Sequence, residues 1–343
     1  MTAFLGILAA VISGTLNGSF AVPAKFNVKW EWENSWLLYT LSAMVIFPVI
    51  ISFLTIPGLV GIYDSVPGGV LLRTFLLGFG WGIGSVTFGL GLHMVGLSVG
   101  YTVIMGLIAV TGSLVPLLVH DPKGVFTSGG VLILLAMLLT VAGVALCGTA
   151  GAARDKAPQT PGRESDARRR FKTGFLVCIT SGVLSAMLNL AFDFGSPIAA
   201  AVKNSLGPSA SSLVANNAIW LLTLLGGAIP NASYCLYLLL RNKSWEKYGD
   251  TGTGLNWFRG VLMGAIWIGC IMSYGAGASN LGKLGAAVGW LILMATTVLV
   301  GNVWGIVTGE WKGSSPKVRR LMVQGLLLLI GSVVLVSLKN LLS

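Results

Sequence analysis

Long apolar stretches alternate with short polar segments along this chain. Residues 34–63, 204–240 and 260–282 contain no Asp, Glu, Lys or Arg. Because a helix of about 20 residues crosses the roughly 30 Å hydrocarbon core of a bilayer, each of these runs is long enough to span a membrane. Breaks at proline, glycine and charge clusters predict ten spans, which are residues 2–22, 35–56, 70–92, 96–119, 126–149, 173–193, 212–240, 258–278, 284–308 and 321–341.

The composition favours a membrane protein over a soluble one. Hydrophobic residues make up 55% of the 343 residues and charged residues only 10%, whereas soluble domains carry about 25% charged residues. Many of the 47 glycines lie within apolar runs, where small residues let membrane helices approach closely. The four cysteines show no paired metal-ligand spacing, so we expect neither a metal site nor another cofactor. The predicted fold class is all-α and polytopic.

Basic residues indicate how the spans are oriented. Most of the 22 Lys and Arg residues lie in loops that follow odd-numbered spans, above all in the hydrophilic segment 150–172. Since short cytoplasmic loops accumulate Lys and Arg, we expect this segment in the cytoplasm and both termini on the opposite side. The formal net charge of +11 is thus an orientation signal, and we expect membrane lipid rather than nucleic acid around this chain.

A weak internal repeat divides the chain into two halves. Each predicted half, residues 1–149 and residues 173–343, holds five spans and is joined to the other by the linker 150–172. Because five is an odd number, the halves should insert in opposite directions, as in secondary transporters built from inverted repeats. Three pairs of short motifs recur in the same order, namely SGTL at 13–16 with SGVL at 181–184, GFGW at 78–81 with GAIW at 264–267, and GLG at 89–91 with GAG at 275–277.

One family resemblance covers most of the chain and is stronger in its first half. Residues 20–36 read FAVPAKFNVKWEWENSW, and further similar motifs are WGIG at 81–84, GLSVG at 96–100, and Glu310-Trp311. With these residues the sequence resembles the L-rhamnose/proton symporter family, within the drug/metabolite transporter superfamily of ten-helix proteins. The resemblance implies proton-driven uptake of L-rhamnose or a related neutral sugar across the bacterial inner membrane, with both termini on the periplasmic side.

A sugar site combines flat aromatic faces with a few convergent polar groups in a pocket. Trp81 and Trp267 each lie about halfway along a predicted span, and the repeat makes them partners across the pseudo-two-fold axis; otherwise they fill space between helices. Polar side chains inside lipid turn toward the bundle interior, where they line a cavity or bond a neighbouring helix. The other substrate-binding candidates are Asn17, Ser85, Asn189, Tyr274 and Asn302.

Proton coupling requires a group that titrates in a partly desolvated position. Asp193 alone among the 11 acids sits at the end of an apolar span that carries a polar patch; the alternative is a solvated residue at a helix end. Glu31 and Glu33 lie in the first cytoplasmic loop close to Lys25 and Lys29. They form either an ion-pair latch for the inner gate or a solvated loop. Under the repeat, Lys25 corresponds to Asp193 at the opposite face.

Other functions fit the sequence less well. GLSVG matches the nucleophile pattern around Ser98, but the chain has only two histidines, His93 and His120, and neither is placed as its base. We therefore expect no catalytic residues and no enzyme activity. A channel would need a carbonyl filter or a charge ring. An exporter or facilitator of other small metabolites on the same scaffold is the alternative, and it is supported by the apolar ninth span.

Overall fold

The computed structural model describes residues 2–155, 164–207 and 210–342, and every regular element within these ranges is a helix. Within these described ranges, ten helical segments are long and apolar enough to cross a membrane. This confirms the all-α, ten-span class predicted from the sequence. Most limits agree to within a few residues, since the span predicted at 212–240, for example, is Ser212–Arg241.

The spans form from single long helices or from shorter helices in series. The first half contains α1 (Thr2–Ser19), η1 (Val22–Phe26), α2 (Trp32–Leu41), η2 (Ser42–Ile46), α3 (Phe47–Thr55), α4 (Leu59–Asp64), α5 (Gly68–Val95), α6 (Leu97–His120), η3 (Gly124–Phe126) and α7 (Ser128–Asp155). The second half contains α8 (Glu164–Phe194), α9 (Ser196–Leu206), α10 (Ser212–Arg241), η4 (Ser244–Gly249), α11 (Gly254–Asn280), η5 (Gly282–Leu284), α12 (Gly285–Val307) and α13 (Pro316–Leu342).

Two segments are more helical than expected. In the predicted linker 150–172, α7 continues to Asp155 and α8 already begins at Glu164. Lys and Arg are good helix formers, so basic residues that lie beyond the bilayer do not stop a helix. The sixth span also reaches further than residue 193, because α9 extends it to Leu206. Gly195 separates α8 from α9, and a proline in the first turn of α9 starts the new helix.

Glycines bring α5 into backbone contact with α10. A Cβ atom added at Gly78 would lie 2.0 Å from the carbonyl oxygen of Thr223, and one added at Gly82 would lie 2.5 Å from that of Gly227. A larger residue at either position would therefore push the two helices apart. This confirms that glycine serves helix packing in these spans.

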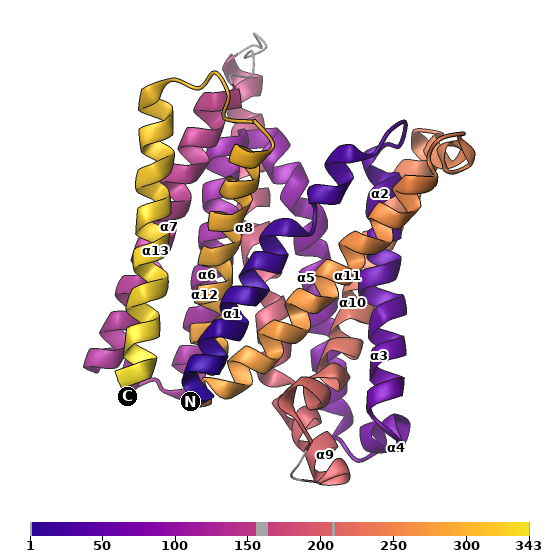
Figure 1. The fold of residues 1–343 in the computed structure, drawn as a ribbon, viewed down its shortest axis with the longest axis vertical. Helices are drawn as coiled ribbons and strands as arrows, with labels where there is room; N and C mark the ends of the chain where they lie inside the picture. The colour runs from indigo at the N-terminus through magenta and orange to yellow at the C-terminus, as the bar shows by residue number, and fades with distance from the viewer. Residues whose placement is uncertain (1, 156–163, 208–209, 343) are drawn as a thin grey trace.

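The helices pack in corresponding pairs. In the first half α1 lies against α11 and α12, and in the second α8 lies against α5 and α6. Likewise α2 packs on α11, while α10 packs on α5. At the edge of the bundle, α7 and α13 lie side by side (Figure 1). The core between these pairs holds most of the buried aromatic side chains.

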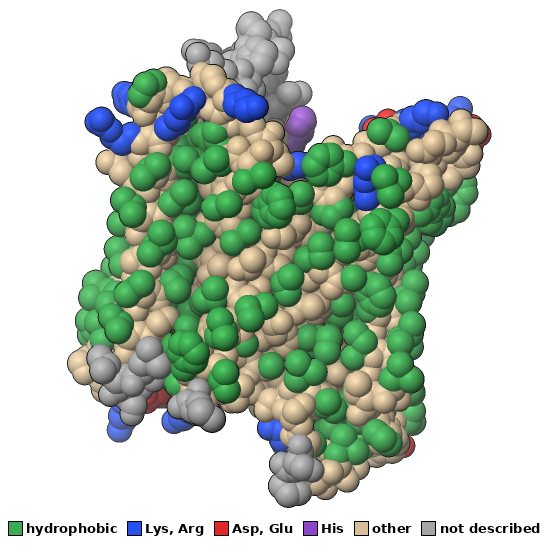
Figure 2. Space-filling model, in the orientation of Figure 1, with side chains coloured by type: hydrophobic (Ala, Val, Ile, Leu, Met, Phe, Trp, Pro, Cys, Tyr) green, Lys and Arg blue, Asp and Glu red, His purple; other side chains and the backbone are tan. Residues whose placement is uncertain are grey.

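The two ends of the bundle differ in charge. Lys25 and Arg154 both pair with Glu310, so the first, fifth and ninth spans finish at one end; we call it the basic end. At the other end α1 begins and α13 finishes (Figure 1). This second end, where α8 carries Asp193, is the terminal end. Figure 2 shows hydrophobic side chains across the middle of the visible face, with more Lys and Arg gathered toward the basic end.

Candidate functional site

Two tryptophans from different halves stack at the centre of the bundle. Trp81 of α5 and Trp267 of α11 have ring centroids 5.4 Å apart and planes inclined by 12°. Both are buried, with exposures of 7% and 4%, and Tyr39 meets Trp267 edge-on at 6.0 Å. The structure thus brings together the two aromatic residues that the repeat paired. Rings in this contact leave no gap for a sugar, so a ligand must part them or bind beside them.

A polar cluster lies next to Trp81 on α5. Ser85 Oγ and Trp36 Nε1 each donate to Asn231 Oδ1 at 3.2 Å, and Asn231 Nδ2 donates to the carbonyl of Gly227 at 3.0 Å. Asn231 is fully buried. The sequence interpretation selected Ser85 but missed Asn231, although an amide within an uncharged span is the same signal that selected Asn189. The cluster joins α2, α5 and α10.

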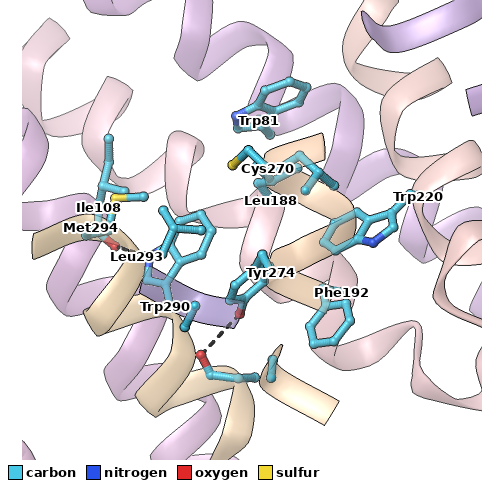
Figure 3. Close-up of a cluster of buried hydrophobic side chains, with 14 of the residues drawn as sticks. Trp81, Ile108, Leu188, Phe192, Trp220, Cys270, Tyr274, Trp290, Leu293 and Met294 are labelled. Atoms are coloured by element: carbon cyan, nitrogen blue, oxygen red, sulfur yellow. Dashed lines mark hydrogen bonds between the residues drawn. The ribbon is translucent and has the colours of Figure 1, made fainter. Parts of the chain in front are cut away.

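Asn189 and Tyr274 form a second buried cluster. The Tyr274 hydroxyl donates to Asn189 Oδ1, and Asn189 Nδ2 donates to the carbonyl oxygens of Gly112 at 2.6 Å and Ala286 at 3.1 Å. Figure 3 shows Tyr274 between Trp220 and Trp290. Both polar side chains are fully buried, and protein groups satisfy their hydrogen bonds in this conformation. The pair therefore connects α8 and α11 with α6 and α12.

The two remaining amide candidates belong to α1 and α12. Asn17 Nδ2 donates to Thr297 Oγ1 at 3.0 Å and so joins these helices. Asn302 Nδ2 donates to the carbonyl of Val298 in its own helix at 2.9 Å, and its side chain lines a cavity at the basic end. The structure thus distributes the seven predicted binding residues over several separate contacts rather than one shared cluster.

Asp193 forms a close pair with a histidine at the terminal end. His120 Nε2, at the last residue of α6, lies 2.9 Å from both carboxylate oxygens of Asp193. An ionised carboxylate only accepts hydrogen bonds, so His120 Nε2 is the donor when Asp193 is ionised. The Asp193 side chain is 9% exposed and that of His120 is 34% exposed. Sequence reasoning considered His120 only as a base for Ser98 and missed this pairing, which brings together residues 73 positions apart.

At the basic end, the charges pair differently from the predicted latch. Lys25 binds Glu310 rather than Glu31 or Glu33, and Arg154 Nη1 lies 2.8 Å from the other Glu310 oxygen. The hydrogen bond from Lys25 holds the pKa of Glu310 below its ordinary value, and the charges of Lys25 and Arg154 add to this effect. Lys25 at the end of the first span lies beside the segment that follows α12, which carries Glu310, whereas the start of α2, with Glu31 and Glu33, lies beside η4.

Glu31 and Glu33 instead tie the start of α2 to the η4 segment. Glu31 pairs with Lys247, while Glu33 accepts hydrogen bonds from Asn242 Nδ2 at 2.9 Å and Ser244 Oγ at 2.6 Å. Glu33 is only 4% exposed, so the expectation of a solvated loop is wrong at this position. By accepting hydrogen bonds from these neutral groups, buried Glu33 holds the start of α2 against the junction between α10 and η4.

Three features bear on the enzyme hypothesis, namely Ser98, possible metal ligands and the cysteines. The Ser98 side chain lies outside the described residues. Among the residues that are described, no three His, Cys, Asp or Glu side chains form a group able to hold a metal ion. The four cysteines are buried and free, in agreement with their interpretation as small hydrophobic residues.

Comparison with known proteins assigns the chain to a family. The sequence model of the L-rhamnose-proton symport protein family matches residues 1–341. An L-rhamnose-proton symporter of Yersinia pestis (strain Pestoides F) is 28% identical over 333 residues, which cover 95% of each chain. The same protein of Yersinia pseudotuberculosis serotype O:1b (strain IP 31758) gives the same identity and coverage. Because the family match spans nearly the whole sequence, this chain belongs to the L-rhamnose-proton symport protein family.

Proposed function

We propose that this protein is a secondary active transporter that takes up L-rhamnose, or a related neutral sugar, together with a proton. The observation that carries this proposal is the family match over residues 1–341. The all-helical bundle of ten spans supports it, because such a bundle can rearrange around a site near the middle of the bilayer. We assign the protein no enzymatic activity.

Alternating access follows from two inverted five-helix repeats. The corresponding packing of α1 on α11 and α12, and of α8 on α5 and α6, supports this division. The pairing of Lys25 and Arg154 with the same residue, Glu310, also supports this division. Since the first and fifth spans finish at the same end, the second half enters the membrane from the side opposite to the first. Rocking of one repeat against the other would then open each end in turn.

The basic end faces the cytoplasm of a bacterial inner membrane in this proposal. Short cytoplasmic loops of membrane proteins accumulate Lys and Arg, and such residues gather at the basic end (Figure 2). Both termini then lie on the periplasmic side, together with Asp193 and His120. The proton and the sugar would enter from that side.

Sugar recognition centres on the stacked tryptophans. The apolar C–H faces of a deoxy sugar suit the flat rings of Trp81 and Trp267, and hydroxyl groups suit the amide and hydroxyl of the Asn231 and Ser85 cluster. In the described conformation the two rings stack on each other. The sugar would therefore separate the rings and bind where they now touch. Asn17, Asn189, Tyr274 and Asn302 contribute by joining the helices that move or by lining the path.

Proton coupling centres on the pair of Asp193 and His120. His120 Nε2 lies 2.9 Å from both carboxylate oxygens of Asp193, so the charge on each group affects the other strongly. Without an added proton the pair carries one negative charge, and with it the pair is neutral. Neutralisation lowers the cost of enclosing the pair in an apolar environment. Proton binding would thus favour closure of the terminal end over the bound sugar.

Uptake into proteoliposomes tests this function. Purified protein is reconstituted, and labelled L-rhamnose uptake is measured with and without an inward proton gradient, with a protonophore as the control that removes the gradient. Accumulation above the external concentration that disappears with the protonophore supports the proposal. Equilibration without accumulation would support a facilitator, and absence of uptake would support an exporter; either result contradicts proton-coupled uptake.

A further inference from the structure

A cavity lies at the basic end, away from the stacked tryptophans. Its volume is about 240 Å³, and its walls come from α6, α7 and α12 and from the segment that follows α12. Trp81 and Trp267, by contrast, project from α5 and α11. Pockets for drug-sized ligands measure about 300–1,000 Å³, so this cavity suits one small ring rather than a larger solute.

Small residues on two helices line the space. Gly148 and Gly151 of α7 and Gly301 and Gly305 of α12 all line the cavity. A Cβ atom added at Gly301 would have no atom within 4 Å, although other glycines of the bundle are tightly packed. A Cβ atom added at Gly305, by contrast, would lie 2.9 Å from Trp311 Nε1 and 3.2 Å from Glu310 Oε2. Gly301 therefore borders open space, whereas Gly305 is in close contact with the segment that follows α12.

The polar groups of the cavity are those that bind sugar hydroxyls. Glu310 and Arg154, whose side chains lie 2.8 Å apart, line the cavity together with Asn302, and Trp311 supplies a buried aromatic ring. The Arg154 guanidinium stands 4.9 Å from the centre of that ring. Carboxylate, guanidinium and amide groups are planar and form paired hydrogen bonds with neighbouring hydroxyl groups, while an aromatic ring covers an apolar sugar face.

We propose that this cavity is an inner binding site for the same neutral sugar, occupied after the sugar leaves the tryptophan pair and before it reaches the cytoplasm. This inference rests on the proposed transport function and adds a second site to it. In the described conformation Lys25 and Arg154 both hold Glu310. The sugar hydroxyls compete for the Glu310 carboxylate, and their release returns it to the two basic side chains.

The test compares the two faces of the membrane. L-rhamnose exchange is measured in right-side-out and in inside-out vesicles, which gives one half-saturating concentration for each face. Gly301→Leu fills the cavity, and Gly69→Leu, at an exposed helical glycine near the terminal end, is the matched control. We expect Gly301→Leu to raise the half-saturating concentration at the cytoplasmic face about tenfold, equivalent to about 1.4 kcal/mol, and to leave the periplasmic value within about twofold.

A second, milder variant tests the inner site if Gly301→Leu abolishes exchange altogether. Asn302→Ala removes one polar group without filling the cavity, and Asn204→Ala, at an exposed position in α9, is its control. The half-saturating concentration at the cytoplasmic face should rise about three- to tenfold, which corresponds to the loss of one hydrogen bond. Such a rise without a change at the periplasmic face supports the inner site. No change with Asn302→Ala, or equal changes at both faces with either cavity variant, would overturn it. Wild-type protein that fails to exchange L-rhamnose at either face would contradict the proposed function instead.

Discussion

Each end of the molecule holds an acid against basic side chains, but the chemistry of the two ends differs. Asp193 at the terminal end pairs with a single histidine, whereas Glu310 at the basic end pairs with Lys25 and Arg154. The Asp193 side chain is 9% exposed and that of Glu310 is 34% exposed. Histidine changes its charge near neutral pH, while lysine and arginine do not. Of these two clusters, the terminal one is suited to respond to protons and the basic one to stay ionised.

The two clusters also occupy corresponding places in the proposed repeat. Lys25 lies at the end of the first span and Asp193 close to the end of α8, and the sequence motifs relate these positions. Their partners, Glu310 and His120, follow α12 and end α6 respectively. The sign of the charge is thus exchanged between the ends. In the proposed mechanism, the two ends would therefore open in response to different events, the terminal end to proton binding and the basic end to competition for the Glu310 carboxylate.

The largest expected effect comes from Asp193→Asn, which removes the titrating acid from the terminal end. Gradient-driven accumulation should be lost, because an amide cannot take up the proton, while exchange of labelled for unlabelled L-rhamnose should continue. At a gradient of one pH unit, one proton per sugar gives about tenfold accumulation in the wild type, since 1.4 kcal/mol is a factor of ten. The measured ratio should fall to unity in the variant.

Two further variants sharpen this result. Asp64→Asn changes an exposed acid in α4 at the same end and should leave accumulation intact. His120→Gln keeps a hydrogen-bond donor for Asp193 but replaces the imidazole with a neutral amide, so its accumulation should be reduced and less dependent on pH. Full accumulation by Asp193→Asn would exclude Asp193 as the coupling acid and remove the contrast between the ends.

An intermediate effect is expected from the tryptophan pair, which lies between the two ends. Trp81→Ala or Trp267→Ala removes one stacked ring, and an aromatic contact contributes about 0.5–1.5 kcal/mol beyond its buried area. The affinity for L-rhamnose should fall about tenfold, and equally at both faces of the membrane, because both ends lead to this site. The affinity at each face is measured by L-rhamnose binding and exchange in right-side-out and inside-out vesicles.

Trp245→Ala serves as the control for the tryptophan pair, because this side chain is 54% exposed in η4. Trp81→Phe, which retains a flat ring, should restore most of the affinity if the ring face rather than the indole nitrogen matters. Unchanged affinity in both alanine variants would leave the aromatic site without support.

The smallest effect is expected from Glu310→Gln. The pKa of Glu310 is lowered in the folded protein, so the stability that its ionised form contributes is present above the ordinary carboxyl pKa and is lost as the pH falls through the lowered value. Because Glu310 is about one-third exposed, the loss should be at most about 1 kcal/mol. The melting temperature in detergent should drop slightly at pH 7, and the difference from wild type should vanish at strongly acidic pH.

This prediction also tests the comparison between the ends. The pH dependence of transport between pH 6 and 8 should keep its shape in Glu310→Gln, since Glu310 stays ionised across that range. A changed profile would mean that the basic end also responds to protons.

Much of the fold could be predicted from the sequence alone. A bilayer accepts only long apolar segments whose backbone bonds are satisfied internally, so the uncharged run at 204–240 had to contain the helix seen at Ser212–Arg241. A repeat of short motifs paired Trp81 with Trp267, although the direct stacking of the two rings is seen only in the structure. Such features depend on neighbouring residues or on internal similarity, and a single sequence contains both.

The partners of the polar and charged residues were decided by the tertiary structure. His120 meets Asp193 across 73 positions, and Lys25 meets Glu310 across 285; no local pattern selects either partner. Glu33 is buried because α2 and η4 pack together, although its position in a charged segment of the sequence is typical of a solvated loop. Hydropathy determines which segments enter the membrane, but hydrogen bonds and ion pairs act over about 3 Å, so only the packing of the helices determines which groups come within that distance.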